Sequence, residues 1–151
     1  MPAGTRFVHT SIVARDWKKL ADFYVQVFGC KRKPPERDLS GEWLQKLTSL
    51  PNPRIRGIHL ALPGFAAGGP TLEIFQYSRS SFRRRSRTNT VGLAHIAFAV
   101  RNVAATLKKL KQQGGSAVGE LVTGKVAGVG DIEVVYARDP EGNIIEIQRW
   151  R

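Results

Sequence analysis

The feature that most restricts how this chain can fold is an internal repeat. The segments FVHTSIVARDWKKLADFYVQVFG and LAHIAFAVRNVAATLKKLKQQGG align when His9 is placed on His95. Seven residues after each histidine stands a residue suited to cap the start of a helix, Asp16 or Asn102. A chain with such matched spacing is expected to contain two copies of one structural unit.

The segments after the two cap residues are expected to be helices. Gly29 and Gly115 each lie twenty residues after a histidine, where a C-terminal cap is expected. Apolar residues at helical spacing form one face of each segment: Trp17, Leu20, Ala21, Tyr24 and Phe28 in the first, and Val103, Leu107 and Leu110 in the second. Each helix is therefore expected to pack on a sheet.

Strand-like segments follow each helix. They cover residues 54–64 and 70–78 in the first half, and 117–125, 131–139 and 143–150 in the second. The pattern predicts a βαβββ module at 5–78, with a helical insert at 38–50, and a second βαβββ module at 90–151. One such module has an apolar sheet face and exposed edges, so two are expected to pack together, within one chain or between two chains.

Length and composition agree with one soluble domain. The chain has 151 residues, of which 42% are hydrophobic, and its apolar runs are too short to span a bilayer. The N-terminal segment lacks the features of a signal peptide, so a cytoplasmic location is expected. The single cysteine, Cys30, excludes an internal disulfide and any zinc site built from several cysteines.

The formal net charge of +12 is partly concentrated in one segment. RSSFRRRSRTNT contains Arg79, Arg83, Arg84, Arg85 and Arg87. A solvated connecting loop is the first interpretation of such a run, because charge runs usually lie on surfaces. Binding of an anionic small molecule and binding of nucleic acid are the alternatives. The sequence contains no recognised nucleic-acid-binding motif, which disfavours the last of these.

Each half carries one histidine and one glutamate in the same order. His9 and Glu73 belong to the first half, and His95 and Glu146 to the second. Two imidazoles and two carboxylates that meet in a cavity form a divalent metal site with two open positions on an octahedral ion. Zn, Ni, Co, Mn and Fe all suit this donor set. His59 has no counterpart in the repeat and is expected to be a structural, hydrogen-bonded histidine.

The segments HTSIVARDWKKLADFYVQVFG, TLEIFQY, LAHIAFAV and DPEGNIIEIQ resemble the glyoxalase / bleomycin-resistance / dioxygenase superfamily, also called the vicinal oxygen chelate family. The resemblance implies a single domain over 1–151 of the α+β class. Its two tandem βαβββ modules would form a cupped, barrel-like mixed sheet with helices outside. It also implies metal ligands at His9, Glu73, His95 and Glu146. Dimers are common in the family, and some members share the site between chains, so a homodimer is expected.

Within that family the ligand set is similar to that of glyoxalase I. Methylmalonyl-CoA epimerases typically have glutamine at the position of Glu73, and ring-cleaving dioxygenases usually use two histidines and one glutamate. Bacterial glyoxalase I enzymes often have glutathione-binding arginine and asparagine residues where this chain has Val13 and Tyr77. These departures argue against glutathione as the co-substrate.

The resemblance implies a metal-dependent isomerase, epimerase or lyase that moves a proton next to a carbonyl of a small molecule. Glu146, or Glu73 by pseudosymmetry, is the expected general base. Tyr77 and Gln148 are candidate substrate contacts, because they lie on the same strand faces as the glutamates. A ring-cleaving dioxygenase and a non-catalytic binding protein similar to antibiotic-resistance proteins are the alternatives.

Overall fold

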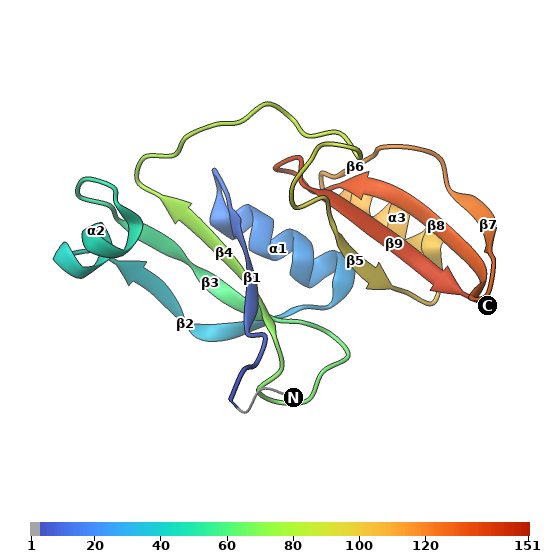
Figure 1. Cartoon of the computed structure of the whole chain (residues 1–151), viewed down its shortest axis with the longest axis horizontal. Coiled ribbons are helices and arrows are strands. Elements are labelled where there is room, and N and C mark those ends of the chain that lie inside the picture. Colours follow the sequence, from blue (N-terminus) through green and yellow to red (C-terminus); the bar gives the residue numbers. More distant parts are fainter. Residues whose placement is uncertain (1–3) are drawn as a thin grey trace. The chain divides into compact units, whose positions relative to one another are not determined.

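The structure is a computed structural model that describes residues 4–151 (Figure 1). The chain divides into two compact units, the first ending at Phe82 and the second spanning Arg83–Arg151. Each unit contains one sheet. Among the described residues, no helix has the length and apolar character needed to cross a membrane.

The first unit is a four-stranded mixed sheet with two helices. Its elements in chain order are β1 (His9–Val13), α1 (Trp17–Phe28), β2 (Lys31–Leu39), α2 (Glu42–Thr48), β3 (Ile55–Ala61) and β4 (Thr71–Tyr77). The strand order is β1-β4-β3-β2. The β1 and β4 strands are parallel, and the other neighbours are antiparallel.

The second unit repeats this plan. Its elements are β5 (Ile96–Ala99), α3 (Val103–Gln112), β6 (Ser116–Ala117), β7 (Val122–Val126), β8 (Gly130–Arg138) and β9 (Ile144–Trp150). The sheet order is β5-β9-β8-β6, and β7 also pairs with β8. The predicted α+β class is confirmed, and both sheets are open rather than closed into barrels.

Both helices of the repeat start where the sequence predicts. The side chain of Asp16 accepts a hydrogen bond from the backbone N–H of Lys19 at 3.1 Å. The side chain of Asn102 accepts one from Ala105 at 2.9 Å. Each bond satisfies a backbone donor that the first helical turn leaves without a partner.

The two helices end differently. Gly29 ends α1 in a left-handed conformation with φ 72°, as predicted. The prediction of Gly115 as the cap of α3 was wrong: α3 has 10 residues against 12 in α1, and Gln113 is its cap. Gly114 then takes the left-handed conformation, with φ 93°, and the N–H of Gly115 bonds the carbonyl of Leu110. The left-handed glycine comes one position early because α3 is shorter.

Each helix covers one face of its own sheet. In the first unit, buried residues of α1 such as Leu20 and Tyr24 pack on β3 and β4, which contribute Leu60 and Ile74. In the second unit, α3 packs on β8 and β9 in the same way, with its buried apolar residues Val103 and Leu110. The opposite face of each sheet is left for other side chains.

The edge strand β2 was missed by the sequence interpretation. Its sequence, KRKPPERDL, combines charges with two prolines, which weakens any strand pattern. The pairing with β3 shifts register between Lys33 and Arg37, and this irregularity accommodates the prolines at the sheet edge. The first two positions of the predicted insert at 38–50 belong to β2 instead, and α2 occupies Glu42–Thr48 within the rest.

The corresponding edge of the second sheet is also interrupted. The sequence predicts one strand at 117–125, but the structure has the short β6 and the separate β7, which pair with different parts of β8. Both units thus have an irregular strand at the same place in the repeat.

The DPEGN turn connects β8 to β9 through Asp139. The carboxylate of Asp139 accepts hydrogen bonds from the backbone N–H groups of Glu141 and Asn143 and from the Asn143 amide. Gly142 has φ 90°, a conformation that glycine adopts without strain. This turn sets where β9 starts and therefore which face of the sheet Glu146 lies on.

Candidate functional site

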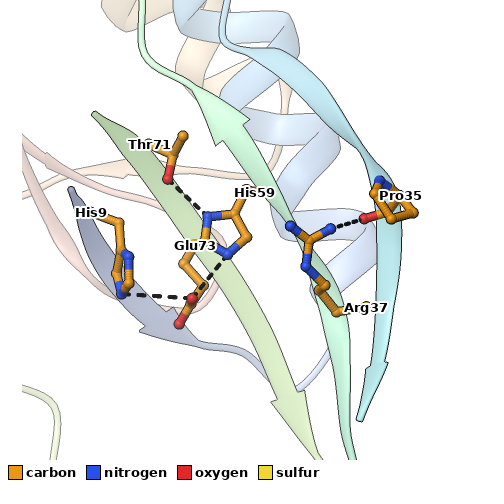
Figure 2. A network of polar contacts seen from close by, with 6 residues as sticks. All are labelled: His9, Pro35, Arg37, His59, Thr71 and Glu73. Carbon is orange, nitrogen blue, oxygen red and sulfur yellow. Dashed lines mark hydrogen bonds and ion pairs between the residues drawn. The ribbon is translucent and has the colours of Figure 1, made fainter. Parts of the chain in front are cut away.

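In the first unit, the sheet face opposite α1 carries a cluster of polar side chains. Glu73 of β4 lies directly opposite His59 of β3, and opposite Ser11 of β1. His9 lies two residues before Ser11 and opposite Thr71. Directly paired residues share a sheet face, so the two histidines and Glu73 lie together (Figure 2).

The contacts within this cluster are short. The Oε2 atom of Glu73 lies 3.0 Å from His59 Nε2 and 3.7 Å from His9 Nε2. His59 Nδ1 lies 2.8 Å from the hydroxyl oxygen of Thr71. One ligand atom from each of His9, His59 and Glu73 lies within 4.8 Å of the others, a spacing that can hold a metal ion.

Burial favours the neutral form of His59. Desolvation lowers the pKa of His59 below its usual value; the nearby carboxylate of Glu73 opposes this shift, whereas the charges of Arg37, His9 and Lys33 add to it. A neutral imidazole offers one ring N–H and one nitrogen lone pair. His59 can therefore either donate Nε2–H to Glu73 while Thr71 donates to Nδ1, or ligate a metal through Nε2 while Nδ1–H bonds Thr71.

The second unit contains the matching pair. Nε2 of His95, one residue before β5, lies 2.9 Å from Oε2 of Glu146. Glu146 lies opposite Ala97, two residues after His95, just as Glu73 lies opposite the residue two after His9. The histidine and glutamate therefore occupy the same strand positions in both units.

The partner of the glutamate on the next strand differs between the units. Tyr136 of β8 lies opposite Glu146, at the position that His59 has opposite Glu73. The ring centroids of His95 and Tyr136 are 5.1 Å apart, and those of His9 and His59 are 5.5 Å apart. A phenol thus replaces an imidazole at the equivalent position.

The four ligands expected from the sequence are therefore brought together in two pairs, one in each unit. His59 is a candidate that the sequence interpretation set aside because it has no repeat partner. Whether His59 lies on the same sheet face as Glu73 depends on the register of the hairpin that joins their strands. That register cannot be read from the sequence.

The expected substrate contacts lie on the same faces as the glutamates. Tyr77 packs against a cluster of Leu44, Ile55 and Phe75, so α2 covers one end of the site face in the first unit. The side-chain oxygen of Gln148 accepts a hydrogen bond from the Trp150 indole at 2.6 Å.

The donor atoms fit a first-row divalent metal in type and spacing. Ligand atoms about 2.0–2.2 Å from one ion are separated by roughly 3–4 Å, depending on the angle between them. The Nε2–Oε2 distances of 2.9, 3.0 and 3.7 Å agree with that range. The side chains of Glu73 and Glu146 are only 13% and 15% exposed, and largely buried carboxylates of this kind need hydrogen-bond donors or a positive charge beside them.

Comparison with known proteins identifies the family. The family model of the Glyoxalase/Bleomycin resistance protein/Dioxygenase superfamily matches residues 6–147, so the chain belongs to this superfamily. A search of curated proteins found none similar enough to count as a match.

Solved structures share the fold. A glyoxalase family protein from Bacillus cereus has a TM-score of 0.82 and 19% identity, with 99% of this chain and 98% of that chain covered. A virulence protein from Salmonella typhimurium is 24% identical, with a TM-score of 0.53 and coverage of 97% and 98%. The fosfomycin resistance protein FosX from Listeria monocytogenes is 17% identical, with a TM-score of 0.59 and coverage of 100% and 96%. At these identities the likeness is one of fold.

Proposed function

We propose that this protein is a metal-dependent isomerase, epimerase or lyase that moves a proton next to a carbonyl group. The observation that carries the proposal is the repeated His–Glu pair, His9 with Glu73 and His95 with Glu146, at the same strand positions in both units. Two half-buried carboxylates, each beside an imidazole nitrogen, form a donor set that binds a divalent cation.

Both pairs would serve one ion, either within a chain or between two copies of it. His9 and His95 would supply neutral imidazole nitrogens, and Glu73 and Glu146 would supply oxygens that offset the positive charge. The bound metal would act as a Lewis acid toward two neighbouring substrate oxygens. Zn, Ni, Co, Mn and Fe all suit these ligands.

Glu146 is our preferred general base. The Glu73 carboxylate is held by His59 at 3.0 Å in addition to its contact with His9, so it is the more constrained of the two. Within residues 4–151, His95 is the one ion-pair partner of Glu146. A less constrained carboxylate can turn toward the substrate, take the proton from the carbon next to the carbonyl, and return it. Such proton transfer contributes about 10²–10⁴-fold to rate.

Tyr77 and Gln148 are proposed as substrate contacts. Tyr77 lies four residues after Glu73 on the same face, beside the apolar cluster under α2. Gln148 lies two residues after Glu146 on β9. These side chains would hold the part of the substrate next to its chelating oxygens.

A second candidate function is a ring-cleaving dioxygenase. His9, His59 and Glu73 form a set of two histidines and one carboxylate within the first unit. Such a set with open positions is typical of non-haem iron oxygenases. In this alternative His59 is a ligand and the second unit supplies none.

Metal content of single variants tests these functions against each other. In the four-ligand proposal, His9→Ala and His95→Ala each lose stoichiometric metal, whereas His59→Ala still binds one ion at saturating metal. In the dioxygenase alternative, His59→Ala loses the metal and His95→Ala keeps it. A wild-type chain that takes up no divalent ion contradicts both and favours a non-catalytic binding protein.

A substrate panel on the metal-loaded protein tests the reaction. The panel contains methylglyoxal with thiols, methylmalonyl-CoA and catechols. Incorporation of solvent deuterium next to a carbonyl supports the proposed proton transfer. Oxygen consumption with catechols in the iron-loaded protein supports the dioxygenase instead.

A further inference from the structure

The edge strand β2 places two cations on the same sheet face as the His–Glu cluster. Lys33 lies directly opposite His59, and Arg37 lies directly opposite Gly57, two residues away on β3. Direct antiparallel partners share a face. A row therefore runs across the sheet from Glu73 through His59 to Lys33.

Lys33 and Arg37 differ in one respect from Arg32 and Arg54, two other cations at this edge, which each have an acidic partner. On the other face of β2, Arg32 forms an ion pair with Asp22. Arg54, just before β3, forms one with Asp38 at 2.7 Å. Within residues 4–151, no carboxylate forms an ion pair with Lys33 or Arg37.

A hydrogen bond ties the side chain of Arg37 to its own strand. One guanidinium nitrogen of Arg37 donates a hydrogen bond to the carbonyl of Pro35, within the irregular part of β2 (Figure 2). Gly57, opposite Arg37, has no side chain, and a Cβ there would lie 2.0 Å from the carbonyl oxygen of Ile74.

We propose that Lys33 and Arg37 bind an anionic group, a carboxylate or a phosphate, of the small molecule that the His–Glu site accepts. The inference rests on the proposed function and adds a substrate class to it. An arginine can present several N–H donors to a carboxylate or phosphate, and a lysine adds a point charge.

The strand order also sets the backbone distance between the two ends of the proposed site. Glu73 and Lys33 lie on strands two positions apart in the sheet, a separation of roughly 10 Å between backbones. A molecule that contacts both the Glu73 end and the Lys33 end of this row therefore has its anionic group several bonds away from its two chelating oxygens.

The test compares three synthetic probes by isothermal titration calorimetry on the metal-loaded protein. One is a neutral hydroxamate, which chelates through two oxygens. The others carry the same hydroxamate on a short alkyl chain that ends in a carboxylate or a phosphonate. The wild type is expected to bind at least one charged probe about tenfold or more tightly than the neutral one, and the better of the two identifies the anion.

The double variant Lys33→Gln/Arg37→Gln should lose that preference and still bind the neutral hydroxamate unchanged. Arg32→Gln is the matched control, because Arg32 lies on the same strand but on the opposite face. Equal binding of all three probes to the wild type, or a preference that survives the double variant, overturns the proposal while the metal site stands.

A second measurement does not depend on metal. Metal-free protein is titrated with glutarate and with propylphosphonate while the Arg37 side-chain N–H resonance is followed by NMR. Saturable shifts in the wild type that vanish in Lys33→Gln support the anion site even if metal uptake fails, in which case only the proposed function falls. The absence of any saturable shift, together with no metal uptake, overturns both.

Discussion

The two units share a backbone plan but differ in what they place beside their glutamates. Ala14 donates its N–H to the carbonyl of Phe75, and Val100 donates to that of Gln148, both five residues after the repeat histidine. Beyond this shared frame, the first unit adds His59 and α2, whereas the second has Tyr136 and no helix between its edge strands and β8.

This difference shows how a repeated scaffold acquires two unequal halves. The His–Glu pair is retained in both units, so it answers a requirement that both share. The residue opposite the glutamate on the next strand differs: it is His59 in the first unit and Tyr136 in the second. Each carboxylate contacts the repeat histidine of its unit, but only Glu73 contacts a second imidazole, which is the basis for giving the two glutamates different roles.

The largest expected effect comes from neutralising the less constrained glutamate. Glu146→Gln should reduce proton exchange in the substrate found by the panel about 10²–10⁴-fold, because the amide cannot accept the proton. The measurement is the rate of deuterium incorporation at saturating metal. Glu73→Gln is the matched change in the other unit and should retain more activity. If Glu73→Gln is the more damaging of the two, the roles are reversed.

The next effect concerns the stability of the first unit. Gly57→Ala should lower the free energy of unfolding by about 3 kcal/mol, because its Cβ would lie 2.0 Å from a backbone oxygen in β4. Urea unfolding followed by circular dichroism measures this change. Gly124→Ala, in a strand of the second unit where the nearest atom is 3.9 Å away, is the control and should change little. If both alanine variants lose the same free energy of unfolding, the close approach of Gly57 in β3 to the backbone of β4 is contradicted.

The asymmetry at the glutamates can be tested directly. His59→Gln should weaken metal affinity about 10–100-fold, because it removes a group that orients Glu73. Tyr136→Phe keeps the ring beside His95 and should have little effect on affinity. Competition with a metal-sensitive dye measures both. Similar losses in the two variants would mean that His59 and Tyr136 serve equivalent roles.

The helix caps should be energetically similar in the two units. Asp16→Ala and Asn102→Ala each remove one side-chain bond to the first helical turn and should cost about 1 kcal/mol. Thermal unfolding of both variants measures the cost. A loss confined to one of them would show that the two helices contribute unequally to their units.

The smallest effect is electrostatic. The hydrogen bond from Arg54 holds the pKa of Asp38 below its usual value of 3.8. A lowered carboxyl pKa stabilises the fold above the unfolded-state value and ceases to do so as pH falls through the folded-state value. Asp38→Asn should therefore lower the Tm slightly at pH 7 and by less at pH 2. An equal drop at both values would point to a loss of packing instead of charge.

Much of the fold was determined by the sequence alone. Two histidines and two N-cap residues at matched spacing, each pair followed by a strand glutamate, specify a duplicated unit. Capping and strand alternation act over a few residues and therefore leave a pattern that can be read from the sequence. This sequence pattern also predicts the α+β class. The sequence also assigned one histidine and one glutamate to each half, but their pairing within each unit follows from the adjacent, parallel first and last strands that the structure shows.

Tertiary structure decided what the sequence left open. The charged, proline-containing β2 becomes a strand only because β3 offers it an edge. His59 comes to lie beside Glu73 through the register of a hairpin, and Lys33 beside His59 through the register of the next pair. Register is set by long-range pairing, and a shift of one residue would turn these side chains to the other face. For that reason the cluster around Glu73 and the cations at its edge are visible only in the folded sheet.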